Sequence, residues 1–369
     1  MFVKSLKLKN FRNYDLLDLE FDSETNIFFG DNAQGKTNIL ESIYLTGTTK
    51  SHRGTKDRDL IKFGEEEAHI ETVVEKQGVP FKIDIHLKKN APKGIAINKI
   101  PIKKASELFG IINIVFFSPE DLNIIKNGPA ERRRFIDIEL AQLDKVYLSD
   151  LSNYNRIVNQ RNKLLKDIYD RKDLLDTLEI WDMQLVHYGE KVIARRKLFI
   201  EQMNEIIEKV HGKLTGEKEK LELVYEPGTG IYDLETALMR NRERDIKMKS
   251  TSVGPHRDDI CFMSNGIDIR KFGSQGQQRT AALSLKLSEI ELVKKVIHDT
   301  PILLLDDVLS ELDKNRQNYL LDSIREIQTL ITCTGLDDFV NHRFAINKVL
   351  HVEQGNVSEN VRPQTFHGV

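Results

Sequence analysis

The sequence predicts an α/β protein in which a helical segment interrupts a lobe built from strands and helices. Alternating strand patterns run from residue 2 to about 119, and strands and helices alternate again from 251 to 357. Between Pro129 and Pro227 there is no proline, and apolar residues recur at the spacing of amphipathic helices. We therefore predict a lobe formed by residues 1–119 and 217–369, with a helical arm at residues 120–216 inserted between its halves.

Local periodicity predicts the individual elements. Leu6–Lys9 and Phe81–Leu87 alternate apolar and polar residues as half-buried strands do. After the arm, a strand is expected at Leu221–Tyr225 and a helix over Asp233–Arg244. Breaks in the helical pattern of the arm are expected near residues 170–173, 189 and 212–216. These breaks favour a short, compact antiparallel arm over one extended coiled coil.

Composition limits the classes of function. The chain has 369 residues with 55 basic and 57 acidic side chains, so a formal charge of −2 gives no overall attraction to nucleic acid, and any DNA-binding surface must be local. Cys261 and Cys333 lie in apolar stretches without metal-ligand spacing and are expected to be buried. No uncharged run of about 18 residues occurs, so we expect a soluble, cytoplasmic protein with no membrane contact.

A glycine-rich loop fits the pattern G-x-x-x-x-G-K-[ST]. It follows the apolar run Asn26–Phe29 and precedes a helical segment that begins with Asn38. Glycines at both ends let the backbone approach phosphate closely, and the following helix N-terminus favours negative charge. We therefore predict a nucleoside triphosphate site in which Lys36 reaches the β- and γ-phosphates and Thr37 offers its hydroxyl to Mg²⁺. The loop consists of Gly30, Asp31, Asn32, Ala33, Gln34, Gly35, Lys36 and Thr37.

Two carboxylates follow a second apolar strand at residues 302–305. A buried strand that ends in acids delivers them to the Mg²⁺ and attacking-water side of a phosphate site. Asp306 is the candidate Mg²⁺ ligand, and Asp307 is the candidate general base that orients or deprotonates the attacking water. The pattern alone is common in α/β proteins, so its weight comes from its pairing with the glycine-rich loop.

A second glycine-bearing turn precedes a helical segment at residues 280–287. Ser274 is a good N-cap, and a turn of this kind at a helix N-terminus can bind phosphate. An ordinary loop-to-helix cap explains the same residues equally well when they are considered alone. The turn lies about thirty residues before the acidic strand, and this order is informative.

The order of these motifs resembles the ABC-type ATPase heads of the SMC-like chromosome and repair proteins. The resemblance covers nearly the entire chain, and it implies an ABC-type (SMC-like) ATPase head with an inserted short helical arm subdomain. The segments that carry it are Phe11–Tyr14, Gly30–Thr37, Phe117–Asp121, Arg132–Phe135, Gly254–Asp259, Ser274–Arg279 and Asp306–Asp313.

In such heads ATP lies between two subunits and joins them. The resemblance implies that Ser274, Gly276 and Gln277 contact the γ-phosphate held by the phosphate loop of a second copy, with Asp313 at the dimer seam. Arg12 and Asn13 match a place where related heads contact nucleotide, and Arg12 fits a surface position in a strand turn equally well. The candidate nucleotide contacts of the chain's own site are therefore the phosphate loop, Asn38, Arg12 and Asn13.

Two departures from the broader ABC pattern bear on turnover. The base position holds Asp307 in place of glutamate, which shortens the carboxylate by one methylene, so ATP hydrolysis should be slow. The strand Leu330–Thr334 lacks the switch histidine of many transporters, which leaves Thr332 or Thr334 as a weaker sensor of the γ-phosphate.

Basic clusters are the candidate DNA contacts. Arg132, Arg133 and Arg134 begin a helical segment and could contact DNA phosphates without reading sequence, although arginines at a helix start more often form ion pairs. A second cluster, Arg195–Lys197, lies on the arm. The segment His256–Asp259 is expected to form an internal network that holds the halves of the lobe together.

The leading hypothesis is an ATP-gated DNA clamp for recombination, repair and replication maintenance. ATP would close a homodimer on DNA, and weak, DNA-stimulated hydrolysis would release it. The resemblance implies gapped duplex or single-strand/duplex junctions as DNA partners, a RecR-type recombination mediator, and a nucleoid-associated location. The alternatives are a kinase and a nucleotide-binding scaffold that does not clamp DNA.

Overall fold

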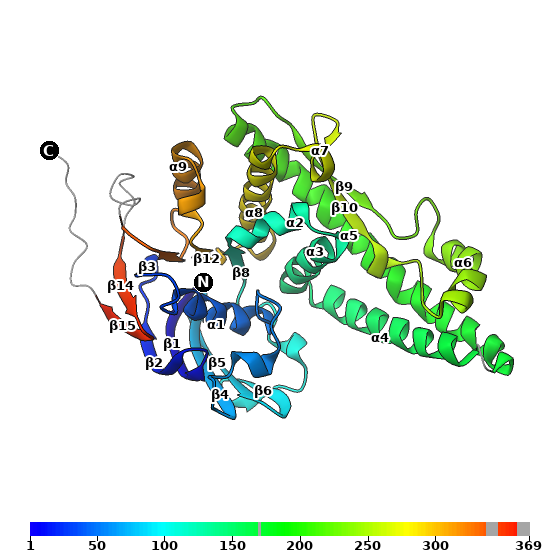
Figure 1. Cartoon of the computed structure of the whole chain (residues 1–369), viewed down its shortest axis with the longest axis horizontal. Helices are drawn as coiled ribbons and strands as arrows, with labels where there is room; N and C mark the ends of the chain where they lie inside the picture. The colour runs from blue at the N-terminus through cyan, green and yellow to red at the C-terminus, as the bar shows by residue number, and fades with distance from the viewer. Residues whose placement is uncertain (169–170, 337–345, 360–369) are drawn as a thin grey trace. The chain divides into compact units, whose positions relative to one another are not determined.

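The computed structural model describes residues 1–168, 171–336 and 346–359, and it divides into two compact units. Unit 1 comprises Met1–Asp121 and Glu289–Val369, and unit 2 comprises Leu122–Ser288. Strands dominate unit 1 and helices dominate unit 2 (Figure 1).

The central sheet of unit 1 has the strand order β15-β14-β3-β13-β12-β8. Its strands are β3 (Thr25–Phe29), β8 (Ile114–Phe117), β12 (Ile302–Asp306), β13 (Thr329–Cys333), β14 (Lys348–Glu353) and β15 (Asn356–Glu359). All neighbouring pairs are parallel except β14 with β15. Strands β12 and β13 are buried along their whole length, as expected for a parallel sheet covered on both faces. The parallel arrangement places the carboxyl ends of β3, β12 and β13 at one edge, where ligands bind in α/β proteins.

The second sheet of unit 1 is antiparallel and has the order β2-β1-β4-β5-β6-β7. Its strands are β1 (Phe2–Phe11), β2 (Tyr14–Glu20), β4 (Glu67–Lys76), β5 (Val79–Lys88), β6 (Ala91–Ile97) and β7 (Ile100–Pro101). Helix α1 (Lys36–Thr48) contacts β8, β12 and β13 of the central sheet and β4 of this one. It is buried along most of its length, and one hydrophobic core joins α1 to both sheets.

Short helical segments complete unit 1: η1 (Asp57–Leu60), η2 (Ala105–Glu107), η3 (Pro119–Asp121), η6 (Leu309–Glu311) and α9 (Lys314–Ser323). Helix α9 follows the acidic end of β12, and Asp313 caps it by accepting hydrogen bonds from the backbone N–H groups of Asn315 and Arg316. Asp313, predicted at a dimer seam, therefore also has a structural task within its own chain.

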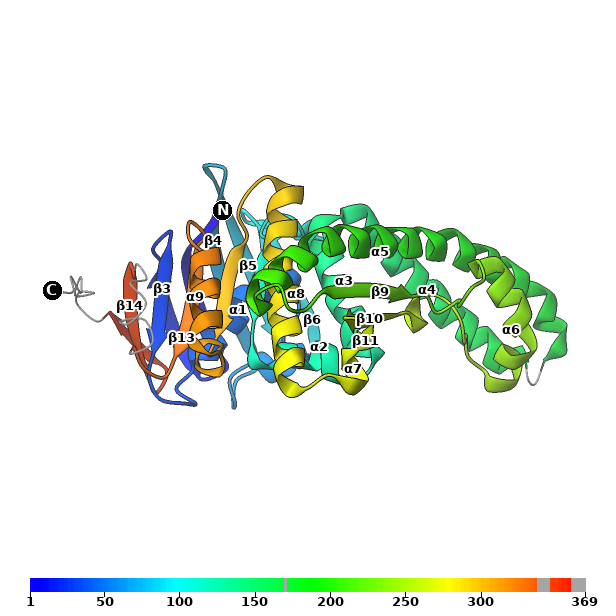
Figure 2. The same ribbon diagram turned by 90° about the horizontal axis from the view of Figure 1, so that it is seen from above.

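Unit 2 is built on two long helices that run side by side, α4 (Lys145–Ile168) and α5 (Leu178–Thr215) (Figure 2). Unit 2 also contains a small sheet with the strand order β11-β10-β9. Its strand β9 runs alongside α5. Figure 2 shows β9 along this helix. The remaining elements are α2 (Leu122–Lys126), α3 (Pro129–Leu143), η4 (Lys172–Thr177), β9 (Leu221–Glu226), α6 (Leu234–Met248), η5 (Pro255–Arg257), β10 (Asp259–Ser264), β11 (Ile267–Asp268) and α7 (Ile269–Phe272). Helix α8 (Gln275–Ile297) begins in unit 2 and ends in unit 1.

Most predicted elements are present, and two details differ. The break expected near Gly189 is absent, because α5 continues through this residue. A Cβ at Gly189 would lie 2.3 Å from Leu234 Cδ2 and 3.1 Å from Tyr154 Cε2, so the glycine permits close packing rather than a turn. The prediction also placed residues 217–288 with the nucleotide-binding lobe, whereas they belong to unit 2, since β9 pairs with β10 and packs on α5.

Within the described ranges, no helix is both long and apolar enough to cross a membrane. Both cysteines are buried, as predicted from their apolar surroundings, and both are free.

Candidate nucleotide-binding site

The phosphate loop connects β3 to α1 and depends on backbone angles that favour glycine. Gly30 has φ +148° and Gly35 has φ +116°. A Cβ at Gly30 would lie 2.3 Å from the carbonyl oxygen of Val352, and one at Gly35 would lie 2.5 Å from Asn13 Nδ2. Both glycines of the motif are therefore required by conformation and by space. Asp31, Asn32 and Ala33 between them are exposed, as a ligand-binding loop requires.

Two neighbouring turns hold the loop in place. From the β1–β2 turn, Asn13 Nδ2 donates to the carbonyl oxygen of Gln34 (3.1 Å), and Tyr14 donates its hydroxyl proton to that of Gly35 (3.1 Å). From the β14–β15 turn, the N–H of Gln354 donates to Gln34 Oε1 (2.7 Å). The loop is thus fixed from both sides. Asn13, predicted to contact nucleotide, supports the loop and also accepts a hydrogen bond from Asn38 Nδ2 (2.8 Å).

Lys36 points back into the loop that precedes it. Its Nζ donates to the carbonyl oxygens of Gly30 (2.5 Å) and Asp31 (2.7 Å), and the residue is 7% exposed. Burial lowers the pKa of Lys36 below its ordinary value, and nearby carboxylates, that of Asp307 foremost, oppose this shift. The ammonium group therefore lies inside the phosphate loop.

Asp306 joins the loop to the central sheet. Its Oδ1 accepts hydrogen bonds from Thr37 Oγ1 and Thr332 Oγ1, each at 2.7 Å. Burial raises the pKa of Asp306, and these two hydrogen bonds oppose the shift by stabilising the carboxylate. The predicted metal ligands, Thr37 and Asp306, are thus brought together. A hydroxyl and a carboxylate are the oxygen donors that suit Mg²⁺.

Asp307 faces a different environment from its neighbour. The residue has φ +52°, in the left-handed region, and its N–H donates to the carbonyl oxygen and the hydroxyl of Thr332 (3.2 and 3.1 Å). Its side chain is half-buried, whereas Asp306 is 8% exposed. This backbone bend separates the two carboxylates, so that one is held by threonines and the other is accessible to water.

Of the two threonines considered as phosphate sensors, only one remains suitable. Thr332 is 2% exposed and donates its hydroxyl proton to Asp306, so it supports the metal ligand. Thr334 is exposed just beyond the end of β13, at the carboxyl edge of the sheet.

Arg12 is engaged within the chain. Its Nε and Nη2 donate to the two carboxylate oxygens of Glu41, each at 2.8 Å, and Ser51 donates to the same carboxylate at 2.5 Å. Glu41 is fully buried in α1. Burial alone would raise the pKa of Glu41, but the hydrogen bonds from Arg12 and Ser51 hold it below its ordinary value. The structure thus gives Arg12 a role in anchoring α1 beside the loop.

The turn before α8 forms a capping box. The N–H of Gln277 donates to Ser274 Oγ (3.2 Å), and the N–H of Ser274 donates to Gln277 Oε1 (3.0 Å). Ser274 and Gly276 are exposed. Gln277 is half-buried and donates through Nε2 to Glu219 Oε1 (3.2 Å). The predicted cap is therefore present, and it leaves the Ser274 turn accessible to a second molecule.

The prediction of DNA contact is wrong for Arg132. Its guanidinium is 4% exposed and makes two hydrogen bonds to the Asp259 carboxylate (2.5 and 3.0 Å) and one to the carbonyl oxygen of Asn127 (2.7 Å). A side chain held in this way does not face solvent or DNA. Arg133 and Arg134 are half-buried, and Arg133 donates to the carbonyl oxygen of Asp258 (2.7 Å).

Arg196 and Asp258 form a buried ion pair in unit 2. The two side chains are each 2% exposed, and Arg196 Nη1 lies 2.7 Å from Asp258 Oδ2. Nearby, His256 Nδ1 lies 2.7 Å from the hydroxyl of Tyr154. The predicted network at residues 256–259 is therefore structural, but it joins α3, α4 and α5 to the strands of unit 2 rather than the halves of the lobe. Burial lowers the pKa of His256 to about 4.

Comparison with known proteins identifies the family. A model of the RecF/RecN/SMC N-terminal domain matches residues 2–358. The DNA replication and repair protein RecF of Agathobacter rectalis is 65% identical over 357 residues, covering 97% of this chain and 99% of that protein. The chain belongs to the RecF family of SMC-like ABC-type ATPases. RecF of Clostridium botulinum is 47% identical over 364 residues, covering 97% of both chains. The chain is therefore a DNA replication and repair protein, as predicted.

Solved structures agree with this assignment. A structure of the recombination mediator protein RecF with ATP, from the RecFOR pathway, has a TM-score of 0.92 and 37% identity and covers 98% of both chains. An Smc head domain with an extended coiled coil from Pyrococcus furiosus has a TM-score of 0.57 and 16% identity and covers 97% of this chain and 96% of that one. The second likeness concerns the fold alone. The predicted ABC-type, SMC-like fold is confirmed.

Several residues that build this RecF-family site were not predicted. Glu41 looks like an ordinary surface position in the sequence, and only the fold buries it beside Arg12. The turn at Gln354 lies more than three hundred residues from the loop that it supports. A buried acid requires a cationic partner, so Arg12 would follow from Glu41 once the burial of this glutamate is known.

Proposed function

We propose that the chain is an ATP- and Mg²⁺-dependent ATPase that dimerises on ATP and clamps DNA. The observation that carries this proposal is the convergence of Lys36, Thr37, Asp306 and Asp307 at the carboxyl ends of β3 and β12. The solved RecF–ATP structure supports ATP as the nucleotide. A kinase would require a separate acceptor site and has no need of the exposed capped turn at Ser274, so this turn favours the ATPase.

Each side chain has a distinct task in this proposal. Lys36 would exchange its two loop carbonyl acceptors for β- and γ-phosphate oxygens. Thr37 and Asp306 would hold Mg²⁺, which neutralises charge developing on the phosphates. Asp307, on the accessible side of the backbone bend, would orient the attacking water and accept its proton. Thr334 would sense the γ-phosphate at the end of β13.

A second copy of the chain would complete the site. Ser274, Gly276 and Gln277 form a helix N-terminus whose serine and glycine are exposed, and such a terminus attracts phosphate. In the dimer these residues would approach the γ-phosphate held by the other subunit, and Asp313 would lie near the seam. ATP then favours the dimer because it makes contacts there that it cannot make in one subunit.

This model predicts that Ser274→Arg blocks ATP-dependent dimerisation while the monomer keeps its nucleotide affinity. The arginine would fill the space intended for the γ-phosphate of the other subunit, whereas the phosphate loop in cis is untouched. Sedimentation velocity with ATP, with ADP and without nucleotide measures assembly, and fluorescent nucleotide titration measures affinity. Asn159→Arg, on the exposed surface of α4, is the matched control. Normal dimerisation of Ser274→Arg would exclude the trans site.

DNA is the proposed macromolecular ligand, with gapped duplex and single-strand/duplex junctions as preferred structures. The relatives are DNA replication and repair proteins, and a RecF structure is described within the RecFOR pathway, which supports a RecR-type mediator as partner. A nucleoid-associated location in the cytoplasm follows from this role. DNA stimulation of a weak ATPase would couple release of the clamp to hydrolysis.

Of the three arginines near the start of α3, Arg134 is proposed to contact DNA phosphate, with Arg133 beside it. Arg134→Gln is expected to weaken binding equally for unrelated sequences and to reduce the slope of log affinity against log salt by about 0.9 per lost phosphate contact. Fluorescence anisotropy with gapped duplex over a salt series measures this slope. Lys209→Gln, which removes one exposed charge from α5, is the control. An unchanged slope for Arg134→Gln would place the DNA elsewhere.

A further inference from the structure

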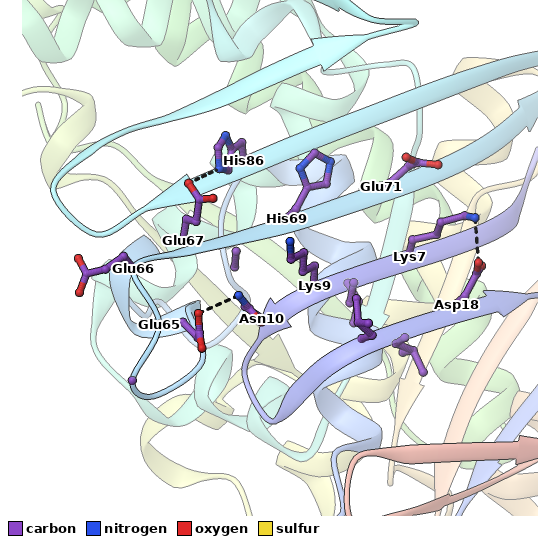
Figure 3. Close-up of a pocket in the computed structure, with 15 residues that line it drawn as sticks. Lys7, Lys9, Asn10, Asp18, Glu65, Glu66, Glu67, His69, Glu71 and His86 are labelled. Carbon is purple, nitrogen blue, oxygen red and sulfur yellow. Dashed lines mark hydrogen bonds and ion pairs between the residues drawn. The ribbon is translucent and has the colours of Figure 1, made fainter.

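The outer face of the antiparallel sheet in unit 1 carries histidines and acids in register. His69 of β4 lies opposite His86 of β5, and two pairs further along, on the same face, Glu71 lies opposite Asp84. The residues that alternate with His69 and Glu71 on β4 are buried on the other face, so strand alternation presents the polar set to solvent; they are Ala68, Ile70 and Thr72. Figure 3 shows His69 and Glu71 along one strand with His86 on its neighbour.

Three of these side chains lie at metal-ligand spacing. The ligand atoms of His69, Glu71 and Asp84 all fall within 4.8 Å of one another, and His69 Nε2 lies 3.4 Å from Asp84 Oδ1. Ligand atoms about 2.1 Å from a tetrahedral Zn²⁺ are separated by about 3.4 Å. The histidine–aspartate pair therefore matches the edge of a zinc coordination tetrahedron, and it is longer than most good hydrogen bonds.

We infer that His69, Glu71 and Asp84 bind a divalent metal ion of the zinc class across β4 and β5. One imidazole and two carboxylates form a mixed nitrogen and oxygen donor set that zinc accepts. His69 and Glu71 also line a surface groove of about 940 Å³, so a water molecule can reach the fourth position. His86 is not counted among the ligands, because its Nε2 lies 3.0 Å from Oε2 of Glu67, a residue outside the cluster of His69, Glu71 and Asp84 (Figure 3).

Lysines compete with the metal for these carboxylates. Lys82 Nζ lies 2.7 Å from Glu71 Oε2, and hydrogen bonding to Glu71 raises the pKa of Lys82. Lys7 lies opposite Glu71 on β1 and pairs with Asp18. A bound ion must displace the Lys82 ammonium, so removal of this lysine should tighten metal binding. This result would distinguish a metal site from an ordinary solvated face, where the lysine only balances charge.

The site is separate from the proposed Mg²⁺ site. Its three ligands are on the antiparallel sheet, whereas Thr37 and Asp306 are at the edge of the central sheet. The inference therefore does not depend on ATP binding or hydrolysis, and it can fail or succeed by itself.

Isothermal titration of the full chain with Zn²⁺, in nucleotide-free buffer, tests the inference. One zinc ion per chain should bind, and His69→Ala and Asp84→Asn should each weaken binding by at least about tenfold, since loss of even an outer-shell partner of a metal ligand commonly costs 10–100-fold. Lys82→Gln should tighten binding. His187→Ala, which removes an exposed histidine from α5, should change nothing.

Circular dichroism of each variant would establish that its fold is intact. The inference is overturned if zinc does not bind the wild-type chain, or if His69→Ala does not weaken zinc binding. It is also overturned if Lys82→Gln leaves the zinc affinity unchanged, as His187→Ala should. Equal weakening by His69→Ala and His187→Ala would indicate adventitious binding to surface histidines and would also reject the site.

Discussion

Asp307→Asn is expected to lower the rate of ATP hydrolysis by about 10²–10⁴-fold, the usual contribution of a positioned general base, while ATP binding is retained. The amide cannot accept the proton of the attacking water. It keeps the hydrogen bonds of Lys36 to the loop carbonyls and of Thr37 to Asp306, and it removes the nearby negative charge that opposes the lowered pKa of Lys36. ATP should therefore hold this variant in the dimer. Single-turnover hydrolysis and sedimentation with ATP measure the two effects.

Two neighbouring substitutions make this test specific. Asp306→Asn removes the carboxylate that Thr37 and Thr332 contact, so Mg²⁺-dependent ATP binding should weaken together with hydrolysis. Asp307→Glu keeps the carboxylate and should retain turnover. If Asp307→Asn hydrolyses ATP at the wild-type rate, the base lies elsewhere. If the wild-type chain itself does not hydrolyse ATP, the nucleotide-binding scaffold becomes the better description.

The parts of the site that sequence could predict are those set by local rules. The phosphate loop requires glycines at Gly30 and Gly35, and the residues needed for phosphate and metal follow directly at Lys36 and Thr37. Asp306 could be placed at the same edge because parallel strands align their carboxyl ends. The predicted cap at Ser274 also rests on local hydrogen bonds, and the structure forms them.

What sequence could not predict depends on contacts between distant segments. Arg132 and Arg134 are indistinguishable in a run of three arginines, yet the fold brings Arg132 against the Asp259 carboxylate of β10 and leaves it 4% exposed. Gly189 looks like a helix break, but a side chain from α6 passes close to it. The assignment of residues 217–288 failed for a similar reason, since strand character does not reveal which unit a strand packs against.

Arg196→Met is expected to lower the free energy of unfolding by about 3–5 kcal/mol at pH 7, the usual cost of removing one partner of a buried ion pair. The variant leaves the Asp258 carboxylate, 2% exposed, without its cationic partner. Urea unfolding measures the loss. Arg195→Met, one position along α5, removes an arginine that is 46% exposed and pairs with Asp144. That control should cost less than about 1 kcal/mol, and an equal loss in both variants would contradict the burial argument.

The pH dependence of the Arg196→Met variant gives a second readout. Burial already raises the pKa of Asp258, and Arg196 is the main charge that opposes the shift. Without the arginine the folded-state pKa rises further above its value in the unfolded chain. A group whose pKa is raised on folding contributes stability at low pH and loses it as the pH rises through the folded-state value. The stability deficit of the variant should therefore shrink as the pH is lowered from 7 towards the pKa of Asp258, because the neutral acid needs no cationic partner.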